Sequence, residues 1–172
     1  MLVIIRGLPG SGKSSMGRSI AALIGCAYVE PDMWLVSNGK YHYTPEEYDR
    51  AERCAAGHLE SLGKMGADAI YADVLPLQTG VAAIEACYGQ RARAIVSLRI
   101  GADDSRMRNR HNVSIADITR FADSWEAIPG EYVVNTADQS AIMRTHGALA
   151  KWVLDRATIP RPKGTFDEGR GR

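Results

Sequence analysis

One short segment near the start of the chain constrains its fold more than any other feature. Gly7-Leu8-Pro9-Gly10-Ser11-Gly12-Lys13-Ser14 fits the pattern G-x-x-x-x-G-K-[ST]. The apolar run Leu2–Ile5 precedes it, and Met16, Ile20 and Ile24 follow it at helical spacing. A buried strand, a glycine-rich turn and an amphipathic helix are the context in which this pattern binds phosphate. The sequence therefore predicts a P-loop.

The residue types in this segment fit the chemistry of ATP and Mg²⁺. Glycines allow backbone N–H groups to converge on a phosphate, and the following helix adds the positive end of its dipole. Lys13 is expected to reach the β- and γ-phosphates, and the Ser14 hydroxyl to bind Mg²⁺. Asp73 ends an apolar run and is expected in the magnesium shell; the alternative is a turn residue at a strand end. The expected nucleotide-binding residues of this segment are Gly7, Leu8, Pro9, Gly10, Ser11, Gly12, Lys13, Ser14 and Ser15.

Strand and helix patterns alternate along the chain. Thr44-Pro45-Glu46-Glu47 is a strong helix start, with a threonine N-cap and proline in the first turn. The expected strands are 2–5, 26–29, 69–73, 93–100 and 132–134, and the expected helices begin near residues 13, 45, 81, 114 and 138. Such alternation indicates an α/β protein with the P-loop NTPase fold, in which helices cover both faces of a parallel sheet. A small helical lid insertion is expected before the last strand.

Length and composition indicate an ordinary globular domain. The chain has 172 residues, of which 45% are hydrophobic and 24% charged, close to the averages for such proteins. We expect one P-loop domain over residues 1–155, with a lid at about 102–127, and a basic, flexible tail over 156–172. Residues 1–5 are too few for a signal peptide, and three scattered cysteines fit no disulfide framework, so we expect a cytoplasmic protein. A net charge of +1 gives no overall attraction to nucleic acid.

Several motifs together resemble a known family. They are Ile4–Ser15, Asp32-Met33-Trp34, Gly39-Lys40-Tyr41-His42-Tyr43 and Arg108-Asn109-Arg110-His111-Asn112-Val113-Ser114. In this combination the chain resembles the polynucleotide 5′-kinase-like P-loop kinases, AAA-like ATP-binding kinases common in phages, over roughly residues 2–152. The resemblance implies a kinase of nucleic acid, located in the host cytoplasm if a phage encodes it.

The resemblance also implies roles for particular residues. Asp32 would act as general base on the acceptor hydroxyl, and Arg108 and Arg110 in the lid would stabilise the transferring phosphoryl group. The loop before the last helix would line the adenine site, so Asn135 and Thr136 would bind the nucleotide.

The residues themselves support these roles in part. Asp32 follows a predicted strand, where acceptors bind in open α/β sheets, although a turn or helix cap after Pro31 is the alternative. Arg106, Arg108 and Arg110 alternate, so in a helix Arg108 would point away from the other two, whereas in an extended loop all three could face a nucleotide.

The sequence leaves open which molecule accepts the phosphoryl group. Leu35 stands where related polynucleotide kinases can carry an arginine, and Val74-Leu75 replaces their polar pair after Asp73. The main hypothesis is an ATP- and Mg²⁺-dependent kinase of a polynucleotide 5′-hydroxyl. The alternatives are a kinase of a hydroxymethyl group on a modified base, such as 5-hydroxymethyluracil in phage DNA, a small-molecule or nucleotide kinase, and a non-catalytic ATP-binding module.

Overall fold

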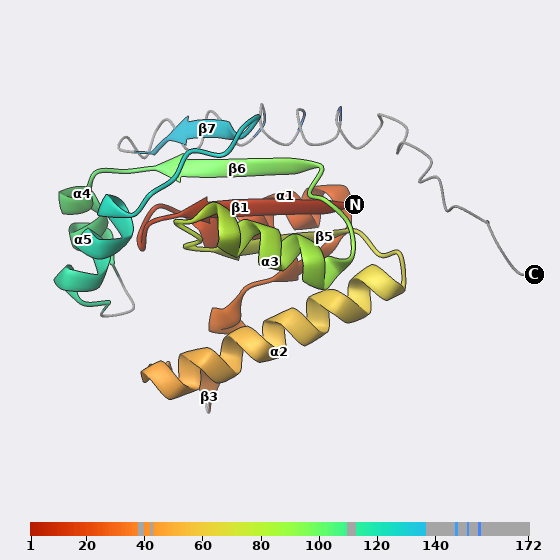
Figure 1. Ribbon diagram of the computed structural model, residues 1–172, viewed down its shortest axis with the longest axis horizontal. Coiled ribbons are helices and arrows are strands. Elements are labelled where there is room, and N and C mark those ends of the chain that lie inside the picture. The colour runs from red at the N-terminus through yellow and green to blue at the C-terminus, as the bar shows by residue number, and fades with distance from the viewer. Residues whose placement is uncertain are drawn as a thin grey trace, which may run out of the picture.

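The computed structural model describes residues 1–37, 40–41, 43–109, 113–136, 147, 151 and 155. Strands and helices alternate along most of it (Figure 1). In chain order the elements are β1 (Leu2–Gly7), α1 (Lys13–Ile24), β2 (Ala27–Val29), the 3₁₀ helix η1 (Pro31–Trp34), β3 (Val36–Ser37), β4 (Lys40–Tyr41), α2 (Pro45–Lys64), β5 (Ala69–Asp73), α3 (Gln78–Tyr88), β6 (Ala94–Arg99), α4 (Ala102–Arg108), α5 (Ile115–Asp123) and β7 (Tyr132–Asn135).

Five strands form one parallel sheet in the order β2-β5-β1-β6-β7. β1 lies at its centre and is buried along its whole length, as its apolar run predicts. Its register pairs Arg6 with Asp73 of β5 on one side and with Ser97 of β6 on the other. The carboxyl ends of these three strands therefore meet at the edge of the sheet from which the P-loop leaves.

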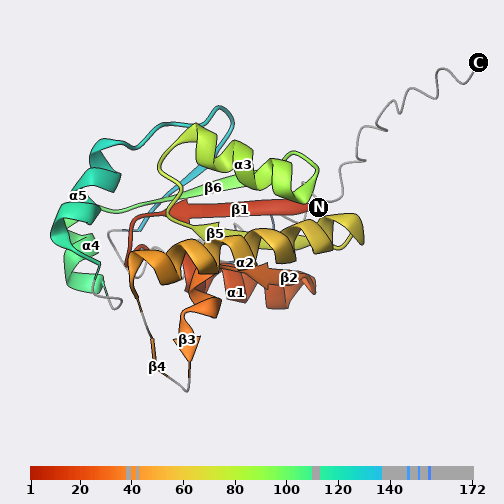
Figure 2. The ribbon, with the colours of Figure 1, turned by 60° about the horizontal axis from the view of Figure 1, so that its bottom comes forward.

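Helices cover both faces of the sheet (Figures 1 and 2). Val3 and Ile5 of β1 pack with Met16 and Ile20 of α1 in one hydrophobic core. The alternate residues of β1 point to the other face, where α2 and α3 form a second core. The predicted α/β fold with a parallel sheet between two helical layers is confirmed.

The helix boundaries follow the capping residues in the sequence. The Thr44 hydroxyl accepts from the backbone N–H of Glu47, and the Ser114 hydroxyl accepts from that of Asp117. Gly25 closes α1 with a φ of 69°, in the left-handed region that favours glycine. The starts of α2 and α5 lie where the sequence predicts them.

One connection was not expected, and another follows one of the two alternatives left open by the sequence. The segment after η1 forms a short hairpin of β3 and β4, whose strands of two residues each are too brief to show a periodic pattern. Before β7 the chain forms two helices, α4 and α5, so Arg106 and Arg108 belong to a helix and not to an extended loop. On α5, Ile118 is buried and Ile115 is 60% exposed.

Some predictions fall on residues outside the described ranges. They are most of the helix expected to begin near residue 138, the whole basic tail at 156–172, and Arg110 with the two residues that follow it. No helix within the described residues combines the length and apolarity needed to cross a membrane.

Candidate active site

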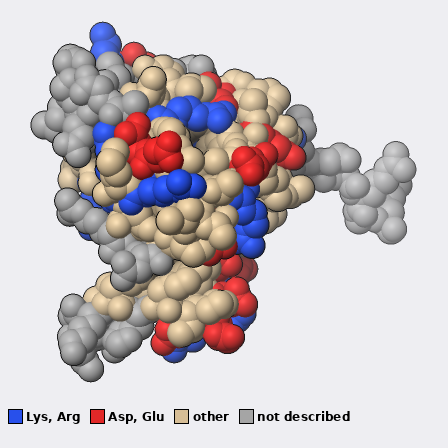
Figure 3. Space-filling model, turned by 90° about the vertical axis from the view of Figure 1, so that its left-hand side faces the viewer, with Lys and Arg blue, Asp and Glu red and all other residues tan. Residues whose placement is uncertain are grey.

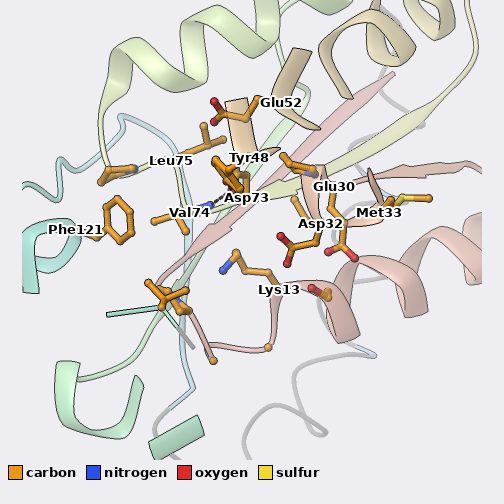
Figure 4. Close-up of a pocket in the computed structure, with 18 of the residues that line it drawn as sticks. Lys13, Glu30, Asp32, Met33, Tyr48, Glu52, Asp73, Val74, Leu75 and Phe121 are labelled. Carbon is orange, nitrogen blue, oxygen red and sulfur yellow. Dashed lines mark hydrogen bonds between the residues drawn. The ribbon is translucent and has the colours of Figure 1, made fainter. Parts of the chain in front are cut away.

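A cavity of about 1120 Å³ opens at the carboxyl ends of β1, β2 and β5 (Figure 4). The P-loop and the start of α1 form one wall, and η1, the β3–β4 hairpin and the first turns of α2 form another. The loop after β5 and residues of α4 and α5 complete it. Ligands of open α/β sheets bind at this kind of edge, so the cavity is the candidate active site.

The P-loop backbone is shaped to receive an anion. Gly10 and Gly12 have φ values of +74° and +94°, which side-chain-bearing residues rarely adopt. A Cβ atom on Gly10 would come within 2.9 Å of Arg108, so this position also needs glycine for space. Gly12 is the N-cap of α1 and provides no side-chain hydrogen bond, which leaves the first N–H groups of α1 open to a ligand.

The Lys13 ammonium lies at the base of the cavity. Its Nζ donates to the carbonyl oxygens of Gly7 (2.8 Å) and Leu8 (3.1 Å). Desolvation lowers the pKa of Lys13, against the opposing charges of Asp73, Asp32 and Glu30. A half-buried ammonium that faces three carboxylates is well placed to hold phosphates while a metal ion offsets the acids.

Asp73 is held rigidly at the end of β5. Its Oδ1 accepts from the hydroxyl of Tyr48 (2.8 Å) and the backbone N–H of Val74 (2.7 Å), and its Oδ2 lies 3.4 Å from the hydroxyl of Tyr71. Desolvation raises its pKa, and the hydrogen bonds from Tyr48 and Val74 and the charge of Lys13 act in the opposite direction.

Magnesium fits these residues in the manner usual for nucleotide sites. No group of three or more histidine, cysteine, aspartate or glutamate side chains that could hold a metal exists among the described residues. Mg²⁺ commonly uses one or two protein ligands together with water and phosphate oxygens. Ser14 and Asp73 both line the cavity and would supply that number.

Two acids lie on the side opposite the P-loop. Asp32 is the second residue of η1, half-buried, and its Oδ1 accepts from the Tyr41 hydroxyl (3.2 Å). Glu30 is buried and is held by the Arg18 guanidinium and the Tyr28 hydroxyl. In Figure 4 the Asp32 carboxylate points toward the side chain of Lys13 across the cavity. An acceptor hydroxyl between them would meet a carboxylate on one side and the phosphate site on the other.

The arginines of α4 have separate surroundings. Arg108 lines the cavity, and its Nη1 donates to the carbonyl of Thr136 (2.7 Å). Arg106 instead contacts Asp103 and Thr119, which joins α4 to α5. Only Arg108 of this described pair is therefore placed to reach a bound nucleotide.

Not every expected nucleotide-binding residue lines the cavity. Its P-loop lining consists of Pro9, Gly10, Gly12, Lys13, Ser14 and Ser15. Leu8 and Ser11 are buried beneath it, and a Cβ on Gly7 would lie 2.8 Å from the Leu98 carbonyl. Thr136 is fully buried, and its backbone N–H and its hydroxyl both donate to the Arg99 carbonyl. Asn135 is the last residue of β7 and is not among the described residues that line the cavity.

Sequence reasoning missed the α2 side of the cavity. Tyr48 and Glu52 lie four residues apart on α2 and line the wall beyond Asp32, together with Tyr43. Their spacing after the Thr44 cap places them on one face of the helix, and this was the available signal. The hairpin residue Tyr41 carried no comparable signal, because its contact with Asp32 depends on tertiary structure.

A buried arginine beside the P-loop was also missed. The Arg6 side chain is fully buried and donates to Ser97 Oγ (2.7 Å), the Leu75 carbonyl (3.0 Å) and Glu131 Oε2 (2.8 Å). Its guanidinium lies 4.5 Å from the ring centre of Trp125. Leu75 lines the cavity and, with a φ of 43°, is the only described non-glycine residue with positive φ. Arg6 thus fixes a strained part of the cavity wall.

Comparisons with known proteins place this geometry among solved folds. No family model matches the chain, and no curated protein matches it. A sugar kinase from Janibacter sp. HTCC2649 is 18% identical, with a TM-score of 0.59 over 93% of this chain and 98% of that chain. A shikimate kinase from Acinetobacter baumannii, solved with shikimate, is 16% identical, with a TM-score of 0.57 over 92% and 95%.

A gluconokinase from Sinorhizobium meliloti is similar to the same extent, at 15% identity and a TM-score of 0.56 over 90% of this chain and 96% of that chain. The chain has the P-loop NTPase fold. At this level of identity the likeness establishes the fold alone, and the family expected from the sequence motifs is not specifically matched.

Proposed function

We propose that this chain is an ATP-dependent kinase that transfers the γ-phosphoryl group to a hydroxyl of a small molecule. The observation that carries the proposal is the arrangement of Lys13 and Asp32 on facing sides of one cavity, with the open N-terminus of α1 between the P-loop and the acceptor space. Phosphoryl transfer needs little more of a protein than positioning and charge stabilisation, and this cavity offers both.

The nucleotide half follows from the P-loop. Lys13 and the N–H groups at the start of α1 would hold the phosphates, and Ser14 with Asp73 would hold Mg²⁺. Bound Mg²⁺ neutralises charge on the β- and γ-phosphates. Arg108 would add a positive charge from α4, and Arg110 belongs to the same proposed lid, outside the described ranges.

The acceptor half follows from Asp32. In the proposed reaction the acceptor oxygen forms a bond to the γ-phosphorus, and the bond from that phosphorus to the β–γ bridging oxygen breaks, so ADP leaves. The hydroxyl proton passes to the carboxylate of Asp32 and then to water. The hydrogen bond from Tyr41 keeps Asp32 directed at the cavity.

Two observations favour a small molecule over nucleic acid. The neighbours in fold include proteins described as sugar kinase, gluconokinase and shikimate kinase. On the face shown in Figure 3, lysine and arginine are interspersed with aspartate and glutamate, and no continuous basic track crosses the described residues. A polyanion needs such a track, because phosphate neutralisation supplies most of its affinity. The small-molecule alternative is therefore better supported than the expected polynucleotide acceptor.

A transfer assay with labelled ATP tests the proposal. The panel contains sugars, polyols, shikimate, amino alcohols, nucleosides, 5′-hydroxyl oligonucleotides and hydroxymethylated duplex DNA. We expect label on a small-molecule alcohol and none with Lys13→Ala. Label on an oligonucleotide or duplex would restore the nucleic-acid hypothesis, and ATP binding without transfer to any acceptor would remove the kinase proposal.

A further inference from the structure

The acceptor side of the cavity has a distinct charge. We call the part lined by η1, the hairpin, α2, the loop after β5 and α5 the acceptor half. The cationic lining residues of the whole cavity, within the described ranges, are Lys13, Arg18 and Arg108. Lys13 and Arg108 lie at the P-loop, and Arg18 is paired with the buried Glu30. Among the described residues that line it, the acceptor half therefore presents acidic side chains and no basic one.

One of these acids has no partner among the described residues. Glu52 lies on α2, one turn after Tyr48, and its side chain lines the cavity without a hydrogen bond or ion pair to another described residue. Figure 4 shows it beyond Tyr48, at the end of the cavity away from Lys13. The other acids are engaged: Asp73 with Tyr48, Asp32 with Tyr41, and Glu30 with Arg18. An unpaired carboxylate near other acids attracts a cation.

The charged groups around Glu52 reinforce this preference. Desolvation raises its pKa, and the negative charges of Asp73 and Asp49 act in the same direction. A bound cation would relieve both effects, whereas a carboxylate or phosphate on the ligand would add to the repulsion.

Apolar side chains surround the same space. Met33, Val36, Tyr43 and Leu77 line the cavity and are 50%, 53%, 44% and 39% exposed. Phe121 reaches the cavity from α5 (Figure 4). Exposed apolar residues are ordinary when scattered, but a group at the rim of one cavity marks a place where apolar surface is buried on binding.

We propose that the acceptor is a small alcohol that carries a protonated amine and an apolar or aromatic body, with the ammonium on Glu52 and the hydroxyl at Asp32. The inference rests on the proposed kinase function and names its substrate class. Glu52 is then a specificity-determining residue, which binds the amine and takes no part in the phosphoryl transfer described above.

Three matched alcohols test the inference with the full chain, Mg²⁺ and labelled ATP. 4-(Aminomethyl)benzyl alcohol carries an amine, 4-methylbenzyl alcohol is neutral, and 4-(hydroxymethyl)benzoate carries a carboxylate, and all three have the same primary hydroxyl across one aromatic ring. We expect kcat/KM to be about tenfold to a hundredfold higher for the amine than for the neutral alcohol, the scale of one hydrogen bond to a charged group. We expect the carboxylate to be the poorest acceptor.

Variants locate the effect. Glu52→Gln should remove the advantage of the amine, mainly through KM, so that 4-(aminomethyl)benzyl alcohol and 4-methylbenzyl alcohol become acceptors of similar kcat/KM. Glu60→Gln is the matched control, because Glu60 lies on the same helix, pairs with Lys64 and does not line the cavity. It should alter neither value.

The outcomes separate this inference from the proposed function. Equal or better transfer to the neutral or acidic alcohol would overturn the amine preference and leave the kinase proposal intact. An unchanged preference in Glu52→Gln would remove the assigned role of Glu52. Failure to label any of the three, while another small alcohol of the wider panel is labelled, would also overturn the inference; failure of the whole panel would overturn both.

Discussion

Replacing Arg6 by methionine is expected to destabilise the protein by about 3–5 kcal/mol, the usual cost of leaving one member of a buried ion pair alone. Arg6 is fully buried and the Glu131 side chain is 6% exposed, and Arg6 Nη2 lies 2.8 Å from Glu131 Oε2. The Leu75 and Glu126 carbonyls would lose the same donor group. For a chain of this size the loss corresponds to a fall in Tm of roughly 6–20 °C.

Equilibrium urea unfolding of four proteins measures the effect: wild type, Arg6→Met, Glu131→Gln and the double variant. The double variant should lose less free energy of unfolding than the two single variants together, because no carboxylate is left unpaired. Arg91→Met is the matched control, since Arg91 is exposed, and should change stability by less than about 0.5 kcal/mol. A loss under about 1 kcal/mol in Arg6→Met, or strict additivity, would refute the reasoning.

The pH dependence provides a second measure of the same pair. Burial alone would raise the pKa of Glu131, but hydrogen bonds from Ser97 and Arg6 and the charge of Arg6 bring it below its ordinary value of 4.5. An acid with a lowered folded-state pKa stabilises the fold above its unfolded-state pKa and loses that contribution as the pH falls through the folded-state value. Wild-type stability should therefore fall below about pH 4.5, and Glu131→Gln should show a smaller decrease.

Three further outcomes are expected. Lys13→Ala should abolish transfer in the labelled-ATP assay, because the phosphates lose their main cation, and near-normal activity would remove the P-loop from the reaction. Arg108→Ala should lower kcat by about tenfold or more, while the Kd of ATP changes little. Arg106 lies on the same helix but contacts Thr119, so Arg106→Ala should leave kcat near wild type. Equal effects of the two substitutions would contradict the role assigned to Arg108. Thr44→Ala should cost about 0.5–2 kcal/mol in urea unfolding through loss of the α2 cap, with Thr44→Ser close to wild type, and an unchanged midpoint would show that the cap contributes nothing.

The fold was predictable because its signals are local. The run Leu2–Ile5 is buried on both faces of β1, and Thr44 and Gly25 mark helix ends whose hydrogen bonds or backbone angles depend only on neighbouring residues. The β3–β4 hairpin was not predictable in this way. Its strands span two residues each, and they show no period that a sequence pattern could reveal.

The site was predictable where one short segment makes it, as in the P-loop, and less so where distant segments meet. Arg6 contacts Ser97, Leu75 and Glu131, which lie 91, 69 and 125 residues away, and no local pattern records such contacts. Glu52 reaches the cavity only because α2 packs beside η1. The charge of the acceptor half, which decides the proposed substrate class, depends on that packing.

The central claim is that Asp32 activates an acceptor hydroxyl beside an ATP-binding P-loop. Asp32→Asn keeps the size and much of the hydrogen bonding of the residue and removes the base. The decisive measurement is single-turnover transfer to the best acceptor of the panel, beside the Kd of ATP and the Tm, with the exposed Asp123→Asn as control. We expect an unchanged Kd and Tm with transfer slowed on the order of a hundredfold or more. Transfer at the wild-type rate would contradict the claim, and loss of folding would assign Asp32 a structural role instead.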